Sequence, residues 1–127
     1  MKKILVVEDD IGIQYILNYT ILNEGYEVIS CGSGKESLNI VETFKPNLII
    51  IDLMLPDISG FNLCRVFSTS YPIIIISSKN DMMDKLDGLT LGADEYITKP
   101  LDMGEVLLKI KNVLKRNSKE SRGCNEL

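Results

Sequence analysis

The sequence of 127 residues contains no histidine and no tryptophan, and it has three cysteines. Without histidine, and without two cysteines at C-x-x-C spacing, a zinc site is not expected. The cysteines Cys31, Cys64 and Cys124 are odd in number and far apart in the chain. We therefore expect reduced, structural thiols of a cytoplasmic protein rather than a disulfide framework.

The chain also lacks an excess of positive charge and a long apolar run. It carries 14 basic and 18 acidic residues, a net charge of −4. An acidic domain is a poor partner for a phosphate backbone, so any contact with DNA has to come from elsewhere. No apolar run reaches the roughly 18 residues that a membrane span needs, and the one after Met1 is too short for a signal peptide. These absences predict a cytoplasmic protein with no membrane contact.

Short apolar runs alternate with longer amphipathic segments along the chain. We predict strands at Ile4–Val7, Val28–Ile29, Leu48–Ile51, Ile73–Ile76 and Tyr96–Ile97. We predict helices over residues 10–23, 33–44, 59–68, 83–91 and 103–116. Five strand–helix units in succession predict an α/β fold, a doubly wound, five-stranded parallel sheet with helices on both faces. Residues 1–117 form one predicted domain, and the polar segment 118–127 is predicted to be a tail or the start of an interdomain linker.

Acids, a hydroxyl and a lysine follow the predicted strands at their carboxyl ends. Glu8, Asp9 and Asp10 come after the first strand, Asp52 after the third, Ser77 after the fourth and Lys99 after the fifth. Parallel strands end at one edge of the sheet, where ligands of such folds bind. Taken singly, Asp10 is explained as a helix N-cap and Lys99 as a surface lysine. Together, the residues predict one site at this edge.

The chemistry of that set suits phosphoryl transfer. Carboxylates without histidine or cysteine form a hard oxygen site, which favours Mg²⁺ over zinc. A carboxylate can also act as a nucleophile toward phosphorus. A divalent ion and a lysine neutralise the phosphoryl oxygens, and a hydroxyl donates a hydrogen bond to them.

Four stretches of the sequence carry a resemblance to a known family. They are I-L-V-V-E-D-D at 4–10, I-I-I-D-L-M-L-P-D-I-S-G at 49–60, P-I-I-I-I-S-S-K at 72–79 and G-A-D-E-Y-I-T-K-P-L at 92–101. In this order they resemble the CheY-like receiver domain of bacterial two-component response regulators, over residues 2–116. The resemblance implies a flavodoxin- or CheY-like (βα)5 fold with strand order 2-1-3-4-5.

The resemblance also implies a role for each site residue. Asp52 is the expected phosphoacceptor, Lys99 binds the phosphoryl group, and Ser77 and Tyr96 are the switch residues. The expected Mg²⁺ ligands are Asp9, Asp52, the backbone carbonyl of Met54 and, through water, Glu8. The implied donor is a sensor histidine kinase, and the domain is a phosphoacceptor that takes part in its own phosphorylation and dephosphorylation, not an enzyme. The Lys99–Pro100 bond is cis in the family's pattern, and Ser78 stands where the family usually has alanine.

Within this family the sequence resembles the OmpR/PhoB type, whose receivers precede a winged-helix DNA-binding domain. That implies a transcription regulator whose DNA-binding domain is not in this sequence. It also implies a homodimer that forms on phosphorylation through the fourth helix, the fifth strand and the fifth helix. The expected pairs on that face are Lys85 with Glu105, Glu95 with Lys109, and Asp94 with Arg116.

Other functions agree less well with the residues. A flavodoxin-type carrier needs a phosphate loop after the first strand, where Glu8 to Asp10 would repel phosphate. The segment G-S-G-K-E at 32–36 departs from the P-loop pattern at Ile29 and Glu36, and it is better explained as a capping box at Ser33. Two alternatives stay open: a stand-alone receiver that acts by protein–protein interaction, and a receiver that is never phosphorylated.

Overall fold

The strands of the sheet are the short apolar runs of the sequence. The computed structural model describes residues 1–78 and 92–126, and of 118–126 the backbone alone. In it β3 (Leu48–Asp52) and β4 (Ile73–Ser77) are buried along their whole length, and β1 (Lys3–Val7) is buried after its first residue. The two remaining strands, β2 (Glu27–Cys31) and β5 (Glu95–Thr98), lie at the edges. Strands with water on neither face need no polar alternation, which explains the Ile-rich sequences of β3 and β4.

All five strands are parallel, in the order β2-β1-β3-β4-β5. The predicted α/β class and strand order are therefore confirmed. The chain moves from β1 outward to β2 and then crosses back to β3, so the order reverses between β1 and β3. This reversal leaves room at the carboxyl ends of β1 and β3, where folds of this kind hold their ligands.

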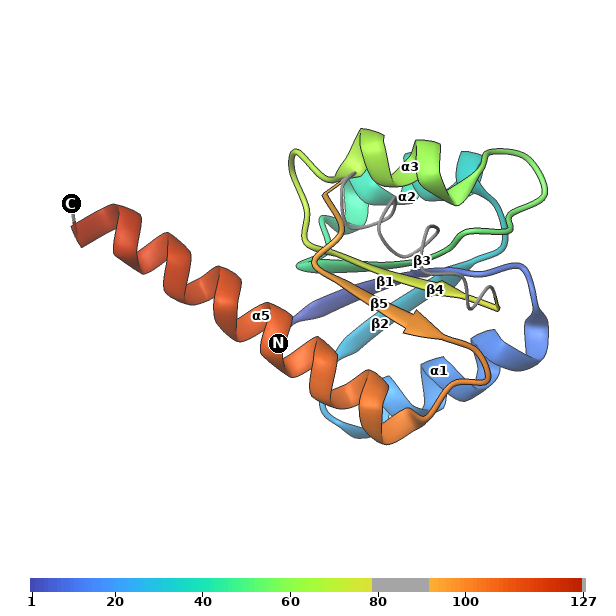
Figure 1. The fold of residues 1–127 in the computed structure, drawn as a ribbon, viewed down its shortest axis with the longest axis horizontal. Helices are drawn as coiled ribbons and strands as arrows, with labels where there is room; N and C mark the ends of the chain where they lie inside the picture. Colours follow the sequence, from blue (N-terminus) through green and yellow to red (C-terminus); the bar gives the residue numbers. More distant parts are fainter. Residues whose placement is uncertain (79–91, 127) are drawn as a thin grey trace.

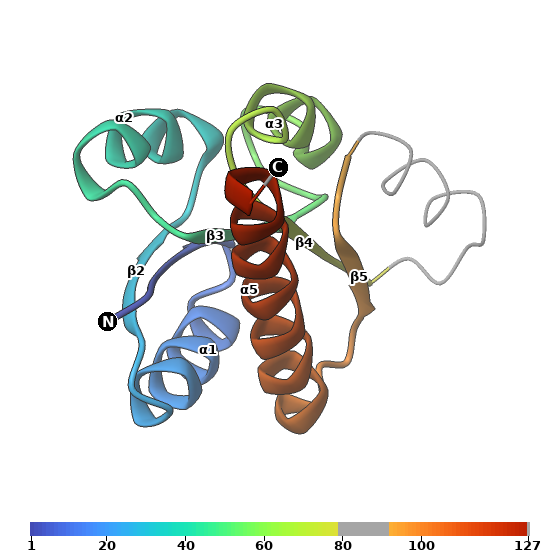
Figure 2. The same ribbon diagram turned by 90° about the vertical axis from the view of Figure 1, so that its left-hand side faces the viewer.

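Helices cover both faces of the sheet (Figures 1 and 2). One face packs against α1 (Ile11–Asn23) and α5 (Met103–Glu126), and the other against α2 (Gly34–Phe44) and α3 (Gly60–Phe67). Alternate strand residues serve the two cores: Leu5, Ile49 and Ile73 lie in one, and Ile4, Ile50 and Ile74 in the other. The helix predicted over 83–91, with Lys85, lies outside the described residues.

Local side-chain caps fix where the helices begin. Asp10 Oδ1 accepts a hydrogen bond from the Ile13 N–H at 3.0 Å, which confirms it as the N-cap of α1. Ser33 caps α2 through the Glu36 N–H at 3.2 Å, and this settles the G-S-G-K-E segment as a helix start rather than a phosphate loop. The Lys99–Pro100 bond is cis, as the resemblance implied.

Helix α5 extends beyond the predicted end at residue 116. It continues to Glu126 and projects from the body of the domain (Figure 1). The predicted helix end at residue 116 was wrong, because the polar composition after Asn117 is compatible with an exposed helix as well as with an irregular tail. Whether the segment is a tail or the start of an interdomain linker stays a prediction. Polar side chains do not stop a helix, and extending an existing helix is far easier than starting one. None of the helices in the described parts of the chain has the length and apolarity needed to cross a bilayer.

Candidate functional site

Three carboxylates meet at the carboxyl edge of the sheet. One oxygen each from Glu8, Asp9 and Asp52 lies within 4.8 Å of the other two. Glu8 follows β1, and Asp52 is the last residue of β3, the neighbouring strand. Glu8 and Asp52 are buried, at 0% and 2% exposure, whereas Asp9 is exposed. The three acids therefore lie close together, as predicted. The group is exposed to solvent at Asp9 and buried at Glu8 and Asp52.

Lys99, from the segment after β5, reaches across β4 into this acidic group. Its Nζ atom lies 2.9 Å from Oδ2 of Asp52 and 2.9 Å from Oε1 of Glu8. The backbone N–H of Met54 donates to the other Asp52 oxygen, Oδ1, at 3.0 Å. Both oxygens of Asp52 are thus held in place, one by an ammonium group and one by the loop that follows β3.

The pKa values of Glu8 and Lys99 reflect this mixed environment. Burial raises the pKa of Glu8 to about 7, although the Lys99 ammonium and the Asp10 N–H favour its charged form. Burial acts to lower the pKa of Lys99, but its bonds to Glu8 and Asp52 outweigh that effect, and the net pKa is raised. Glu8 can therefore exchange a proton near neutral pH, while Lys99 stays charged.

The acidic group fits a magnesium ion by the chemistry of its donors. All the donors are oxygens, as Mg²⁺ prefers. Glu8 Oε1 is also a buried oxygen whose partner among the described residues is the Lys99 ammonium, 2.9 Å away, so a second donor can still reach it. A buried oxygen with an unused lone pair suits contact with a metal-bound water.

The two expected switch residues, Ser77 and Tyr96, are buried. Ser77 is the last residue of β4 and is 0% exposed. Tyr96 lies on β5, is 5% exposed, and belongs to the core on the α2–α3 side of the sheet. The Tyr96 side chain therefore lies in the core in this structure. That it also occupies an outward position, and moves between the two, stays a prediction.

Most residues of the expected dimer face form contacts inside the chain. Lys109 Nζ lies 3.4 Å from Glu95 and 3.3 Å from Glu105, and Arg116 lies 3.7 Å from Glu95. Asp94 Oδ2 instead accepts the N–H of Ile73 at 2.9 Å, at the start of β4. The charges are therefore gathered on one face, and pairing across a dimer stays a prediction.

Sequence reasoning missed residues that shape the loop after Glu8 and, above all, the loop after Asp52. Gly60 starts α3 so close to this loop that a Cβ atom there would lie 2.4 Å from the carbonyl oxygen of Asp52. Asp57 binds the first turn of α2. Gln14 of α1 donates to the backbone carbonyl of Glu8. The P-D-I-S-G segment is typical of a tight loop, but its sequence does not indicate that Asp57 binds α2.

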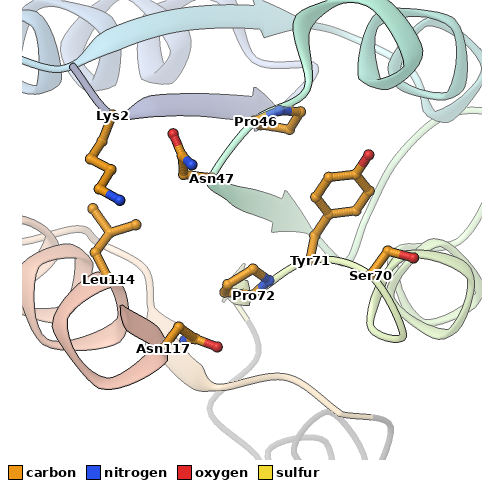
Figure 3. A pocket seen from close by; sticks show the side chains of 8 residues that line it. All are labelled: Lys2, Pro46, Asn47, Ser70, Tyr71, Pro72, Leu114 and Asn117. Atoms are coloured by element: carbon orange, nitrogen blue, oxygen red, sulfur yellow. The ribbon is translucent and has the colours of Figure 1, made fainter. Parts of the chain in front are cut away.

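Among the hollows in the described part of the protein, two have a well-defined lining near the sheet. The larger, of about 500 Å³, is lined by Lys2, Asn47, Tyr71 and Pro72, among others, at the amino ends of the strands (Figure 3). The smaller, of about 300 Å³, lies beside Lys99 and is lined by Ile13, Ile16, Pro100, Leu101 and Met103. Lys99 is the site residue in its lining, and the other lining residues are apolar.

Comparison with known families identifies this arrangement. Residues 4–111 match the family described as the response regulator receiver domain. The chain belongs to that family. In this receiver domain the matched region contains every residue of the acidic group and the five strands of the sheet apart from Lys3, the first residue of β1.

Curated relatives of the receiver domain are transcription regulators. It is 41% identical to the alkaline phosphatase synthesis transcriptional regulatory protein PhoP of Bacillus subtilis, over 91% of this chain and 50% of that protein. It is 36% identical to the DNA-binding response regulator MtrA of Mycobacterium tuberculosis, over 94% of this chain and 53% of that protein. The chain thus spans about half the length of the curated relatives it matches.

Solved structures agree with the fold. A CheY-like response regulator receiver domain from Methanospirillum hungatei superimposes with a TM-score of 0.88 at 32% identity, covering 94% of this chain and 98% of that one. The receiver domain therefore has the CheY-like form of the flavodoxin-like fold.

Proposed function

We propose that this receiver domain is switched by transfer of a phosphoryl group to Asp52 from a phosphohistidine of a sensor histidine kinase. The observation that carries the proposal is the setting of Asp52: a buried carboxylate with the Lys99 ammonium 2.9 Å from one oxygen and two further acids close by. Contacts with Met54 and Lys99 hold both oxygens of this buried acid in a fixed orientation at the carboxyl edge of the sheet, as a nucleophile requires.

The transfer needs one bond made and one bond broken. An oxygen of Asp52 forms a bond to phosphorus while the phosphorus–nitrogen bond breaks, and its electron pair returns to the donor's imidazole. Lys99 offsets negative charge on the phosphoryl oxygens, and the Ser77 hydroxyl donates a hydrogen bond to one of them. Asp9, Asp52 and the Met54 carbonyl, with Glu8 through water, would hold a Mg²⁺ ion, which would supply the remaining positive charge.

The phosphohistidine donor lies outside this domain, because these 127 residues contain no histidine. The apolar hollow beside Lys99 supports a docking position for it: Ile13 and Ile16 of α1 and Leu101 lie next to the site and offer uncharged contact area. A partner that fills this hollow with apolar side chains brings its phosphohistidine to the open edge at Asp9.

The output we propose is regulation of transcription in the cytoplasm, through a DNA-binding domain in the full-length protein. Two observations support this: the relatives are named as transcriptional or DNA-binding regulators, and they are about twice as long as this chain. Phosphorylation draws Ser77 toward the phosphoryl group and favours the inward position of Tyr96. The domain then dimerises through the helix predicted over residues 83–91, β5 and α5. A stand-alone receiver acting by protein–protein interaction is the alternative, and the reading frame downstream of residue 127 discriminates between the two.

Intact-mass measurement after incubation with acetyl phosphate and Mg²⁺ tests the phosphoacceptor. We expect one phosphoryl group on the wild-type domain and none on Asp52→Asn. The exposed acid Asp102, which caps α5, gives a matched control: Asp102→Asn should be phosphorylated as the wild type is. Full labelling of Asp52→Asn would show that another residue accepts the phosphoryl group. No labelling of the wild type, with or without a kinase, would favour the non-phosphorylated interaction module.

A further inference from the structure

The loop that follows Asp52 is tied to the first turn of α2 by the side chain of Asp57. Asp57 Oδ1 accepts a hydrogen bond from the Gly34 N–H at 2.8 Å, and Oδ2 accepts one from the Lys35 N–H at 2.9 Å. The first N–H groups of a helix have no partner within it, and a carboxylate satisfies two of them at once. These bonds, from Lys35 first and Gly34 second, hold the pKa of Asp57 below its usual value.

Close packing supports the same junction. A Cβ atom at Gly34 would lie 2.9 Å from Cβ of Ile58, the neighbour of Asp57, so the helix and the loop touch where glycine leaves room. At its other end the loop closes through the Gly60 N–H, which donates to the Leu53 carbonyl at 3.0 Å. The segment is therefore fastened at its base by Gly60 and at its tip by Asp57.

Met54 lies between these two fastenings. Its N–H donates to Asp52 Oδ1 at 3.0 Å, and its side chain is 58% exposed. The position of its peptide group therefore depends on the course of the loop rather than on burial of the side chain. The Met54 carbonyl is the one backbone ligand that the proposed function assigns to Mg²⁺.

We propose that Asp57 is a positioning residue for the Mg²⁺ site: it fixes the loop to α2, and so holds the Met54 carbonyl where the ion needs it. This inference rests on the proposed function. Groups behind a metal's direct ligands set ligand orientation, and their loss commonly weakens metal binding by about tenfold or more. Mg²⁺ is sensitive to such loss because it requires near-ideal octahedral geometry.

If Asp57 served only as a cap of α2, then other changes at the same helix end should weaken Mg²⁺ binding as much as Asp57→Ala does. Three variants distinguish this from a positioning role. Ser33 caps the same helix end, and the hydrogen bonds of its side chain go to Glu36 rather than to the loop, so Ser33→Ala removes a cap and leaves the tether. Glu36, in the same first turn, is a matched charge control, because Glu36→Gln removes a negative charge from that helix end without untying the loop. Asp57→Asn removes the charge of Asp57 and keeps one acceptor oxygen.

The test is a Mg²⁺ titration of the whole chain followed by amide NMR, together with the Mg²⁺ dependence of phosphorylation by acetyl phosphate. We expect Asp57→Ala to weaken Mg²⁺ binding roughly tenfold and to raise the half-saturating Mg²⁺ concentration equally, with a rate at saturating Mg²⁺ close to that of wild type. Asp57→Asn should show a smaller loss, and Ser33→Ala and Glu36→Gln should bind Mg²⁺ as wild type does, even where Ser33→Ala lowers the melting temperature.

Equal Mg²⁺ affinity in wild type and Asp57→Ala overturns the inference and leaves the proposed function intact. An equal loss in Ser33→Ala, or in Glu36→Gln, also overturns it, because helix capping or charge alone would then explain the effect. If Asp57→Ala does not fold, Asp57→Asn against Glu36→Gln decides, since both lack one charge and only the first weakens the tether. A wild-type domain that binds no Mg²⁺ overturns the proposed function and this inference together.

Discussion

The Nζ atom of Lys99 lies 2.9 Å from Oδ2 of Asp52, although 47 residues separate the two in the chain. The same ammonium group lies 2.9 Å from Oε1 of Glu8. One cation therefore stands between two buried acids whose charges would otherwise repel each other. This places Lys99 to support the acidic group before any phosphoryl group arrives, and it makes the lysine part of the domain's stability as well as of its proposed chemistry.

Replacing Lys99 should separate these two roles. Lys99→Ala leaves Glu8 and Asp52 buried without their cation, so we expect a loss of about 1–3 kcal/mol in the free energy of unfolding without Mg²⁺. Mg²⁺ should restore much of that loss, because the ion replaces the missing charge. Phosphorylation should nevertheless stay slow, since the ion cannot replace the lysine at the phosphoryl oxygens. Urea unfolding with and without Mg²⁺ measures the first effect, and Lys109→Ala, in a partly exposed ion pair, is the control.

The raised pKa of Glu8 predicts a pH dependence of stability. Its pKa is about 7 in the folded protein, against 4.5 ordinarily. Between these values the folded state holds a proton that the unfolded state has lost, so the contribution of this group to stability falls as the pH rises from about 4.5 to 7. Chemical unfolding of the Mg²⁺-free protein across that range, compared with Glu8→Gln, isolates the effect. The prediction is contradicted if the difference in free energy of unfolding between wild type and Glu8→Gln does not change over this pH range.

The thiols of Cys31 and Cys64 should be unreactive in the folded domain. Both are buried, and burial raises the pKa of each from 9.0 to about 11. Two pKa units leave roughly a hundredfold less thiolate near neutral pH, and burial also blocks the reagent. Iodoacetamide labelling at pH 8, with peptide mapping by mass spectrometry, should modify these two residues only after denaturation. Rapid labelling of Cys64 in the native protein would show that this part of the core opens.

Ser77 should couple phosphorylation to the position of Tyr96. We expect Ser77→Ala still to accept phosphate. The NMR signals of the Tyr96 ring should no longer respond to beryllofluoride, because this variant lacks the hydroxyl that moves toward the phosphoryl group. Ser78→Ala, one residue further along, is the matched control and should keep the response. A Tyr96 ring that responds equally in wild type and Ser77→Ala contradicts this coupling.

Phosphorylation should promote a salt-sensitive homodimer. Glu95 binds Lys109 and Arg116 within the chain, so pairing across a two-fold axis requires these groups to exchange partners. Sedimentation with beryllofluoride should show a dimer that weakens with added salt, and Lys109→Glu should remain monomeric. The charge-swapped variant Glu95→Lys with Lys109→Glu should recover part of the association, whereas Lys111→Glu, elsewhere on α5, should have little effect. Association of Lys109→Glu equal to wild type would place the interface elsewhere.

Much of the fold could be predicted because its signals are local. The runs at Leu48–Ile51 and Ile73–Ile76 are apolar throughout, as strands buried on both faces must be, and the caps at Asp10 and Ser33 depend on residues three positions away. The meeting of Glu8, Asp9, Asp52 and Lys99 also followed from sequence, because parallel strands end at one edge and each of these residues stands at a strand end.

Other features were decided only when the chain was folded. That Lys99 bridges two acids, and that Asp57 binds a helix 22 and 23 residues earlier in the sequence, depends on how loops close over the sheet. The burial of Tyr96 and the use of Glu95 within the chain depend on packing around β5. Periodicity and strand-end position report which face or edge a residue occupies. Which side chain it meets there is set by distances between segments that are far apart in sequence, and these exist only in the tertiary structure.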